Sequence, residues 1–130
     1  VLSQTEVDTL VKNIEKARQD FELLGYKFEE LIEDMDRNIY IQFGQKDGYR
    51  IELVSPLKTG PNPVDTYLAT TGNTPYHICY CSDDLDMEIK NLENQRYKVI
   101  IPAKEAIAFG GRRVVFMINK NIGMIEVVEE

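Results

Sequence analysis

An internal repeat is the feature that most restricts how this chain of 130 residues can fold. Residues 26–28 (Tyr-Lys-Phe) align with residues 97–99 (Tyr-Lys-Val) at an offset of 71 residues. Farther along, residues 50–54 (Arg-Ile-Glu-Leu-Val) align with residues 124–128 (Met-Ile-Glu-Val-Val) at an offset of 74, which also aligns Phe43 with Met117. Segments repeated in the same order indicate two structural modules of one plan.

Each module shows the periodicity of one helix followed by strands. Asn13 is suited to cap a helix, apolar residues recur after it at helical spacing, and Gly25 is suited to end it. The second module repeats this pattern after Asp83 or Asp84. The expected strands are residues 6–11, 26–31, 38–43 and 49–54, then 77–81, 98–101, 112–118 and 123–128, with hairpin turns at 44–48 and 119–123.

The resulting prediction is an α+β fold of two tandem βαβββ modules. We expect them to form one cupped, open, eight-stranded mixed sheet with the helices outside. The first module covers about residues 5–56 and the second about residues 75–130. Residues 57–74, rich in Gly, Pro, Thr and Asn, are interpreted as a linker. A chain of this length suits a single domain over residues 1–130.

The charge of the chain restricts its partners. It carries 22 Asp and Glu against 15 Lys and Arg, a formal net charge of -7. Such a field repels phosphate backbones and anionic membranes, so we expect neither nucleic acid nor a membrane as a partner. The sequence has no apolar run of roughly 20 residues and its first ten residues do not resemble a signal peptide, so a cytoplasmic location is expected.

Four candidate metal ligands occupy two matching pairs of strand positions. At the offset of 71 His77 aligns with Glu6, and at the offset of 74 Glu126 aligns with Glu52. If the modules pack about a pseudo-twofold axis, these side chains converge on one point and form a four-ligand site. Taken singly, Glu52 and Glu126 could instead face solvent, His77 could be a hydrogen-bonded core residue, and Glu6 could lie in a frayed start. The match in both halves favours the shared site.

Two further groups of residues have competing interpretations. Cys79 and Cys81, the only cysteines, are interpreted as reduced core thiols; a zinc pair is the alternative, although their spacing is short for one. Lys104, Arg112 and Arg113 could meet an anionic substrate. The favoured interpretation of this basic stretch is a turn followed by a solvated strand start.

With these modules and the segments 50–56, 75–80 and 123–129, the chain resembles the vicinal oxygen chelate superfamily of glyoxalases, bleomycin-resistance proteins and dioxygenases. It is most similar there to methylmalonyl-CoA epimerases and bacterial glyoxalase-like proteins, over most of its length. In that family two lead-strand His residues, a Glu or Gln closing the first module and a final-strand Glu hold one divalent metal. Glu52, His77 and Glu126 match this pattern. Glu6 stands in the first His position and Asp8 in the Gly position of the family's His-x-Gly strand.

This resemblance implies a metal-dependent epimerase or isomerase of a carbon acid, acting by proton abstraction and a metal-stabilised enolate. The activity would be methylmalonyl-CoA epimerase-like or lactoylglutathione lyase (glyoxalase I)-like, on an acyl-CoA or a glutathione thioester. Glu126 is the first candidate for the catalytic base and Glu52 the second. The family also implies a homodimer. The alternative is a non-catalytic, metal-free protein that binds small molecules or confers resistance.

The implied cofactor is one divalent ion, drawn from manganese, cobalt, nickel, magnesium, iron, calcium and zinc. Three carboxylates and one imidazole form a harder ligand set than two of each. Coordination by Glu6 would therefore favour manganese, magnesium, calcium or iron over zinc.

Overall fold

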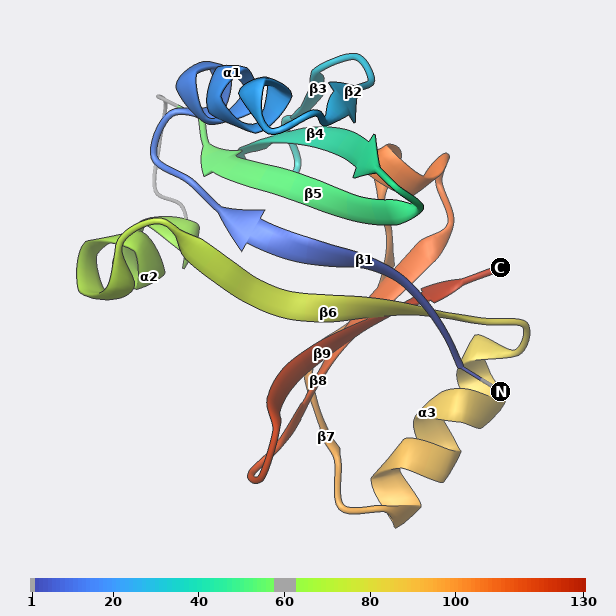
Figure 1. Ribbon diagram of the computed structural model, residues 1–130. Helices are drawn as coiled ribbons and strands as arrows, with labels where there is room; N and C mark the ends of the chain where they lie inside the picture. Colours follow the sequence, from blue (N-terminus) through green and yellow to red (C-terminus); the bar gives the residue numbers. More distant parts are fainter. Residues whose placement is uncertain (1, 58–62) are drawn as a thin grey trace. The chain divides into compact units, whose positions relative to one another are not determined.

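The computed structural model describes residues 2–57 and 63–130, which divide into two compact units (Figure 1). The N-terminal unit is Glu6–Tyr76, and the C-terminal unit is His77–Glu130 together with residues 2–5. Each unit contains one of the two predicted modules. That both belong to a single domain over residues 1–130 stays a prediction.

The N-terminal unit holds most of the first strand, two helices and four further strands. Its strands hydrogen-bond in the order β2-β4-β5-β1, with β3 also paired to β4. The elements are β1 (Ser3–Leu10), α1 (Ile14–Leu23), β2 (Lys27–Phe28), β3 (Ile32–Asp34), β4 (Ile39–Lys46), β5 (Tyr49–Pro56) and α2 (Pro63–Thr71).

The C-terminal unit repeats the plan with one α-helix and four strands in the order β6-β9-β8-β7. The first residues of β1 also belong to it, where Thr5 Oγ1 donates a hydrogen bond to the Cys79 carbonyl at 3.1 Å. The elements are β6 (Thr74–Ser82), α3 (Leu85–Asn94), β7 (Lys98–Glu105), the short 3₁₀ helix η1 (Ile107–Phe109), β8 (Arg113–Asn119) and β9 (Gly123–Glu129).

The predicted fold class is confirmed. The described residues form an α+β fold with an open, mixed sheet of nine strands, eight of them in the main order. The sheet is mixed because β1 and β6 run parallel to β5 and β9 respectively, whereas the hairpins are antiparallel. Figure 1 shows α1 beside β4 and β5 in one unit, and α3 beside β7 and β9 in the other.

Both predicted helices begin where a side chain caps them. The Asn13 side chain accepts a hydrogen bond from Lys16 N at 2.9 Å and starts α1. Of the two candidates in the second module, Asp84 is the cap of α3 and accepts from Met87 N at 3.1 Å. Such caps satisfy backbone N–H groups that the first helical turn leaves without a partner. The helix starts were thus readable from short-range sequence signals.

The prediction of a linker over residues 57–74 needs a correction. Residues 58–62 lie outside the described residues, but Pro63–Thr71 is the helix α2, with Leu68 buried. Proline is tolerated in the first turn of a helix because its missing N–H would have no helical acceptor there. Gly72, at φ +73°, then ends the helix by donating to the Leu68 carbonyl at 2.8 Å.

The expected strand over residues 26–31 is also corrected, because only Lys27 and Phe28 of these residues form a strand (β2), and a separate short strand, β3, starts at Ile32 on the same edge of β4. Phe28 lies opposite Gly44 and Ile32 lies opposite Ile41. Between them Glu29 N donates to the Phe43 carbonyl at 2.9 Å, and the Gln42 side chain donates to the Glu29 carbonyl at 2.8 Å. A side chain here takes the place of a backbone donor and interrupts the regular ladder.

The hairpin turns explain why one alignment offset is wrong by a single residue. Phe43 lies opposite Glu52, but Glu126 lies opposite Phe116 rather than the predicted Met117. The first hairpin turns at Asp47 and Gly48, both at positive φ, as a two-residue turn of type I′ requires. The second turns between Asn119 and Gly123, which adds one residue to the loop. On the two strands of this hairpin the offset between the modules is therefore 73 residues before the turn and 74 after it.

No helix in the part of the chain that the structure describes is long and apolar enough to cross a membrane.

Candidate metal-binding and catalytic site

The N-terminal unit gathers three buried carboxylates on one sheet face. Glu6 and Asp8 are two residues apart on β1 and so point the same way, and Asp8 lies directly opposite Glu52 on the parallel strand β5. Their relative exposures are 3%, 2% and 4%. One oxygen from each can be chosen so that all lie within 4.8 Å of one another. Three carboxylate oxygens this close form a group that could hold a cation.

The opposite face of this half-sheet is apolar and is covered by α1. Val11, Ile51 and Leu53 pack there with Ile14 of the helix. Alternation along β1 and β5 thus sends the apolar side chains to the helix and the carboxylates to the other face. Glu52 is buried because of its position on the strand, although a carboxylate group is by itself more stable in water.

Arg50 brings positive charge to the carboxylate face. Its guanidinium lies 3.9 Å from Glu6 Oε2 and 2.5 Å from Glu29 Oε2. It also stacks over the Phe43 ring, 4.3 Å from the ring centroid. An arginine held by a carboxylate and an aromatic ring loses little further freedom in each contact. Arg50 therefore provides a fixed counter-charge beside Glu6.

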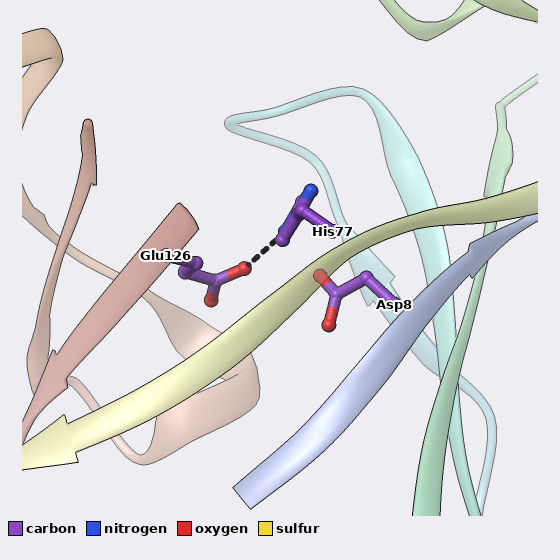
Figure 2. Close-up of side chains that lie close together, drawn as sticks. All are labelled: Asp8, His77 and Glu126. Carbon is purple, nitrogen blue, oxygen red and sulfur yellow. Dashed lines mark hydrogen bonds and ion pairs between the residues drawn. The ribbon is translucent and has the colours of Figure 1, made fainter. Parts of the chain in front are cut away.

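The C-terminal unit places the other two predicted residues in contact. His77 Nε2 lies 2.8 Å from Glu126 Oε1, and Figure 2 shows the two side chains turned toward each other. Both are buried, and the Phe116 ring meets the imidazole edge to face at 5.5 Å. Cys79, two residues after His77, lies opposite Glu126 in the parallel pair β6 and β9. The pair thus holds the strand positions that Glu6 and Glu52 hold in the first module.

An apolar cluster lies on the same face of this half-sheet as the His77–Glu126 pair. Cys79 packs there with Ala106, Val114 and Val128, and Phe109 of η1 lies against them. Neither cysteine forms a disulfide, as expected, and Cys79 is fully buried in the core, whereas Cys81 is only partly buried. Apolar walls of this kind exclude water and strengthen the hydrogen bond between the two polar side chains.

The structure decides several of the competing interpretations. Glu52 and Glu126 are buried, so the solvent-facing alternative is wrong. Glu6 lies within β1 rather than in a frayed start. His77 is hydrogen-bonded and buried, in keeping with both interpretations offered for it. Glu6 and Glu52 come together in one unit and His77 and Glu126 in the other, while convergence of all four on one ion stays a prediction.

The basic stretch of the second module binds residues of its own unit. Arg113 Nε lies 3.1 Å from Glu129 Oε2, and its Nη1 lies 3.2 Å from Asp86 Oδ1. These hydrogen bonds, the one to Glu129 first, raise the pKa of Arg113, and those from Arg113 lower the pKa of Glu129. Arg112 donates to the Phe109 carbonyl at 2.9 Å. The contacts favour a structural strand start over a substrate anchor.

Asp8 is the polar residue of this face that the sequence-based ligand set left out. The alternation of strand residues placed it on the face of Glu6, so one signal was present in the sequence. Its position opposite Glu52 depends on the pairing of β1 with β5. That register is a tertiary fact and could not be read from either segment alone.

The available ligand atoms fit an oxygen-preferring divalent ion. The N-terminal unit offers three carboxylates, and the C-terminal unit offers an imidazole and a carboxylate in contact. Carboxylates suit manganese, magnesium and calcium, and imidazole also suits zinc and iron. The donor types therefore agree with a divalent metal and favour the harder members of the series.

The sequence matches the profile of a known protein family over most of its length. The sequence profile of the glyoxalase/bleomycin resistance protein/dioxygenase superfamily matches residues 6–116. A search of curated proteins gives no match.

Solved structures match the whole fold. A hypothetical protein from Bacillus halodurans has a TM-score of 0.88 at 16% identity, covering 99% of this chain and 94% of that one. Methylmalonyl-CoA epimerase from Mycobacterium tuberculosis has a TM-score of 0.82 at 21% identity, covering 97% and 86%. A variant of the Streptomyces coelicolor methylmalonyl-CoA epimerase with 2-nitronate-propionyl-CoA has a TM-score of 0.84 at 15% identity, covering 100% and 99%. At such identities the likeness shows the fold.

Proposed function

Because the chain belongs to the glyoxalase/bleomycin resistance protein/dioxygenase superfamily, we propose that it is a metal-dependent epimerase or isomerase of a carbon acid. The observation that carries this proposal is the burial of a glutamate at the same strand position of both modules. Glu52 and Glu126 each lie on a closing strand, beside a parallel lead strand, at 4% and 2% exposure. Buried carboxylates are costly and are retained where they bind or react.

The proposed ligands of one divalent ion are Glu6, Glu52, His77 and Glu126. Two contribute from each module, at strand positions that the pairing registers make equivalent. Their donor types suit such an ion, and the superfamily supports a metal in the fold. A divalent ion there would supply Lewis-acid polarisation of a carbonyl next to the carbon that loses its proton.

Glu126 is the proposed base. The 2.8 Å contact between His77 Nε2 and Glu126 Oε1 orients its carboxylate, and the neighbouring apolar cluster keeps water away from it. In this role Glu126 accepts the proton from the substrate's α-carbon. Glu52, equally buried in the first module, is the second candidate. Return of the proton to the opposite face gives epimerisation, and delivery to the neighbouring carbon gives isomerisation of the glyoxalase I (lactoylglutathione lyase) kind.

The proposed substrate is a small thioester of the acyl-CoA class, ahead of a glutathione hemithioacetal. The support is the group of structural relatives named as methylmalonyl-CoA epimerases, one of them solved with methylmalonyl-CoA. These relatives are 21% identical or less, so the proposed substrate class rests on similarity of fold.

A non-catalytic, metal-free binding or resistance protein is the second candidate. Its support is the start of β1, where Glu6 and Asp8 replace the His-x-Gly pattern of the family. The two candidates differ in one measurable reaction. An epimerase exchanges the α-proton of its substrate with solvent, and a binding protein does not.

The test is α-proton exchange in D₂O by the metal-loaded protein, followed by mass spectrometry on a panel of acyl-CoA thioesters and glutathione hemithioacetals. Incorporation of deuterium into one class supports the proposed function and selects the substrate. No incorporation in any member, at full metal occupancy, would end the epimerase proposal in favour of the binding protein.

We also propose that the protein is a homodimer, by analogy with the family, and that it is located in the cytoplasm. Sedimentation at micromolar concentration and cell fractionation test these two points. A monomer, or a membrane-bound fraction, would contradict them.

A further inference from the structure

We infer that Asp8 is a further ligand of the proposed ion and sets its preference for hard, oxygen-binding cations such as Mn²⁺ over Zn²⁺. This inference rests on the proposed function, because it concerns the same metal site. It adds a residue to the four-ligand set and assigns that residue a role in selectivity.

The geometry comes from the register of the N-terminal unit. Asp8 is the direct partner of Glu52 in the parallel pair β1 and β5, and it follows Glu6 by two residues on the same face. Its exposure is 2%, the lowest of the three. Oxygens of all three side chains lie within 4.8 Å of one another, so a cation bound by Glu6 and Glu52 has Asp8 within reach.

Comparison with the second module shows that the fold does not require a charge at this position. Cys79 stands opposite Glu126 as Asp8 stands opposite Glu52. Cys79 is fully buried and packs among Ala106, Val114 and Val128 as an apolar side chain. The same strand position is thus filled by core packing in one module and by a carboxylate in the other. A carboxylate buried where the other module has an apolar side chain is costly, and a bound cation would offset that cost.

The chemistry of the added ligand determines the direction of the selectivity. A third carboxylate raises the number of oxygen donors and the negative charge, which suits Mn²⁺, Mg²⁺ or Ca²⁺ with six or more ligands. Zn²⁺ prefers four ligands and gains most from nitrogen and sulfur. Asp8 therefore increases the affinity for hard ions more than that for Zn²⁺.

The test compares the full-length protein with Asp8→Asn and Asp8→Gly, the latter carrying the small residue of the family pattern. Mn²⁺ binding is followed by loss of the electron paramagnetic resonance signal of free Mn²⁺, and Zn²⁺ binding by competition. Because most protein sites bind Zn²⁺ more tightly than Mn²⁺, the quantity compared is the ratio of the two Kd values. Both variants should lose Mn²⁺ affinity by about tenfold or more and Zn²⁺ affinity by less.

Asp34 supplies the matched control. It is as buried as Asp8, at 2%, and lies in the same unit, but it accepts a hydrogen bond from Arg37 N at 3.0 Å and pairs with the Arg37 guanidinium. Asp34→Asn should lower thermal stability and leave the Mn²⁺-to-Zn²⁺ ratio of Kd values unchanged. Circular dichroism of every variant identifies any that fails to fold, and the two Asp8 substitutions provide independent chances of a folded protein.

The outcomes distinguish a failure of the inference about Asp8 from a failure of the proposed function. A wild-type ratio retained in a folded Asp8 variant would overturn the inference and leave the proposed function intact. A wild-type protein that binds neither ion would overturn the proposed function, and the inference with it. A shift of the ratio in the Asp34 control as large as in the Asp8 variants would also overturn the inference, because loss of any buried carboxylate would then explain the effect.

Discussion

Glu126→Gln is the substitution that best separates a catalytic glutamate from a structural one. It removes the ability of the side chain to take a proton and keeps its size and its hydrogen-bonding capacity. Glu52→Gln is the matched change in the other module, at a position where the family pattern that this chain resembles accepts Glu or Gln. Both glutamates are buried on closing strands, so the two variants differ mainly in the role proposed for each carboxylate.

The geometry of the His77–Glu126 pair determines the expected magnitudes. At 2.8 Å the contact is a full hydrogen bond, and an amide oxygen can replace the carboxylate as its acceptor. A hydrogen bond to a charged group contributes about 1.5–3 kcal/mol and a neutral one about 0.5–1.5 kcal/mol, so Glu126→Gln should lower the free energy of unfolding by about 1 kcal/mol. Loss of a general base should lower the exchange rate by about 10²- to 10⁴-fold.

The assay measures three quantities on the same preparations. α-Proton exchange in D₂O gives the activity, elemental analysis gives the metal content, and urea unfolding gives the stability. Activity is expressed per bound metal, so that loss of the ion is not mistaken for loss of the base. Glu52→Gln should reduce exchange by a smaller factor than Glu126→Gln.

Three results would each refute a step of the reasoning. Exchange by Glu126→Gln at the wild-type rate per bound metal would show that Glu126 is not the base. An equal or larger loss of exchange activity in Glu52→Gln would show that Glu52, in the first module, is the better candidate for the base. A fall in stability of several kcal/mol in Glu126→Gln would show that the hydrogen bond to His77 is not kept by the amide.

Three further predictions concern the fold. Gly44→Ala should lower the free energy of unfolding by about 1–3 kcal/mol in urea, because its Cβ would lie 2.5 Å from the Phe28 ring; no loss would show that the ring moves aside freely. Glu129 stabilises the fold above its unfolded pKa, usually near 4.5, and this contribution is lost as the pH falls through its lower folded pKa. Arg113→Gln should raise the pKa of Glu129 toward that usual value in an NMR titration, and an unchanged pKa would contradict the assigned cause. Asp84→Ala should cost about 1 kcal/mol through loss of the α3 cap, measured by thermal unfolding, and an unchanged stability would exclude that cap as a stabilising contact.

Some features of the fold could be read from neighbouring residues. Asn13 and Asp84 start helices through bonds to backbone groups three residues ahead, so the signal and its effect lie within one turn. The Asp47-Gly48 turn is equally local, because it depends on two residues that tolerate positive φ. The repeat itself was visible in strand segments, because residues 26–28 align with residues 97–99 and residues 50–54 with residues 124–128.

Other features were hidden because local signals were ambiguous. Pro63 is typical both of a linker and of a first helical position, and only the structure shows that the helix α2 forms there, with Leu68 buried. Of the single strand expected over residues 26–31 only β2 forms, and β3 starts beyond it at Ile32, because the Gln42 side chain bonds to the Glu29 carbonyl between the two strands. Such side-chain contacts across strands leave no periodic trace in the sequence.

The candidate site also has some features that the sequence shows and others that only the structure shows. The sequence by itself determined that Glu6 matches His77 and that Glu52 matches Glu126, because alignment of a repeat compares positions without knowing their neighbours. Only the tertiary structure decided that these side chains are buried and that Asp8 stands opposite Glu52. The physical reason is that pairing of parallel strands joins distant segments, and a shift of one residue in that pairing would turn every side chain to the other face.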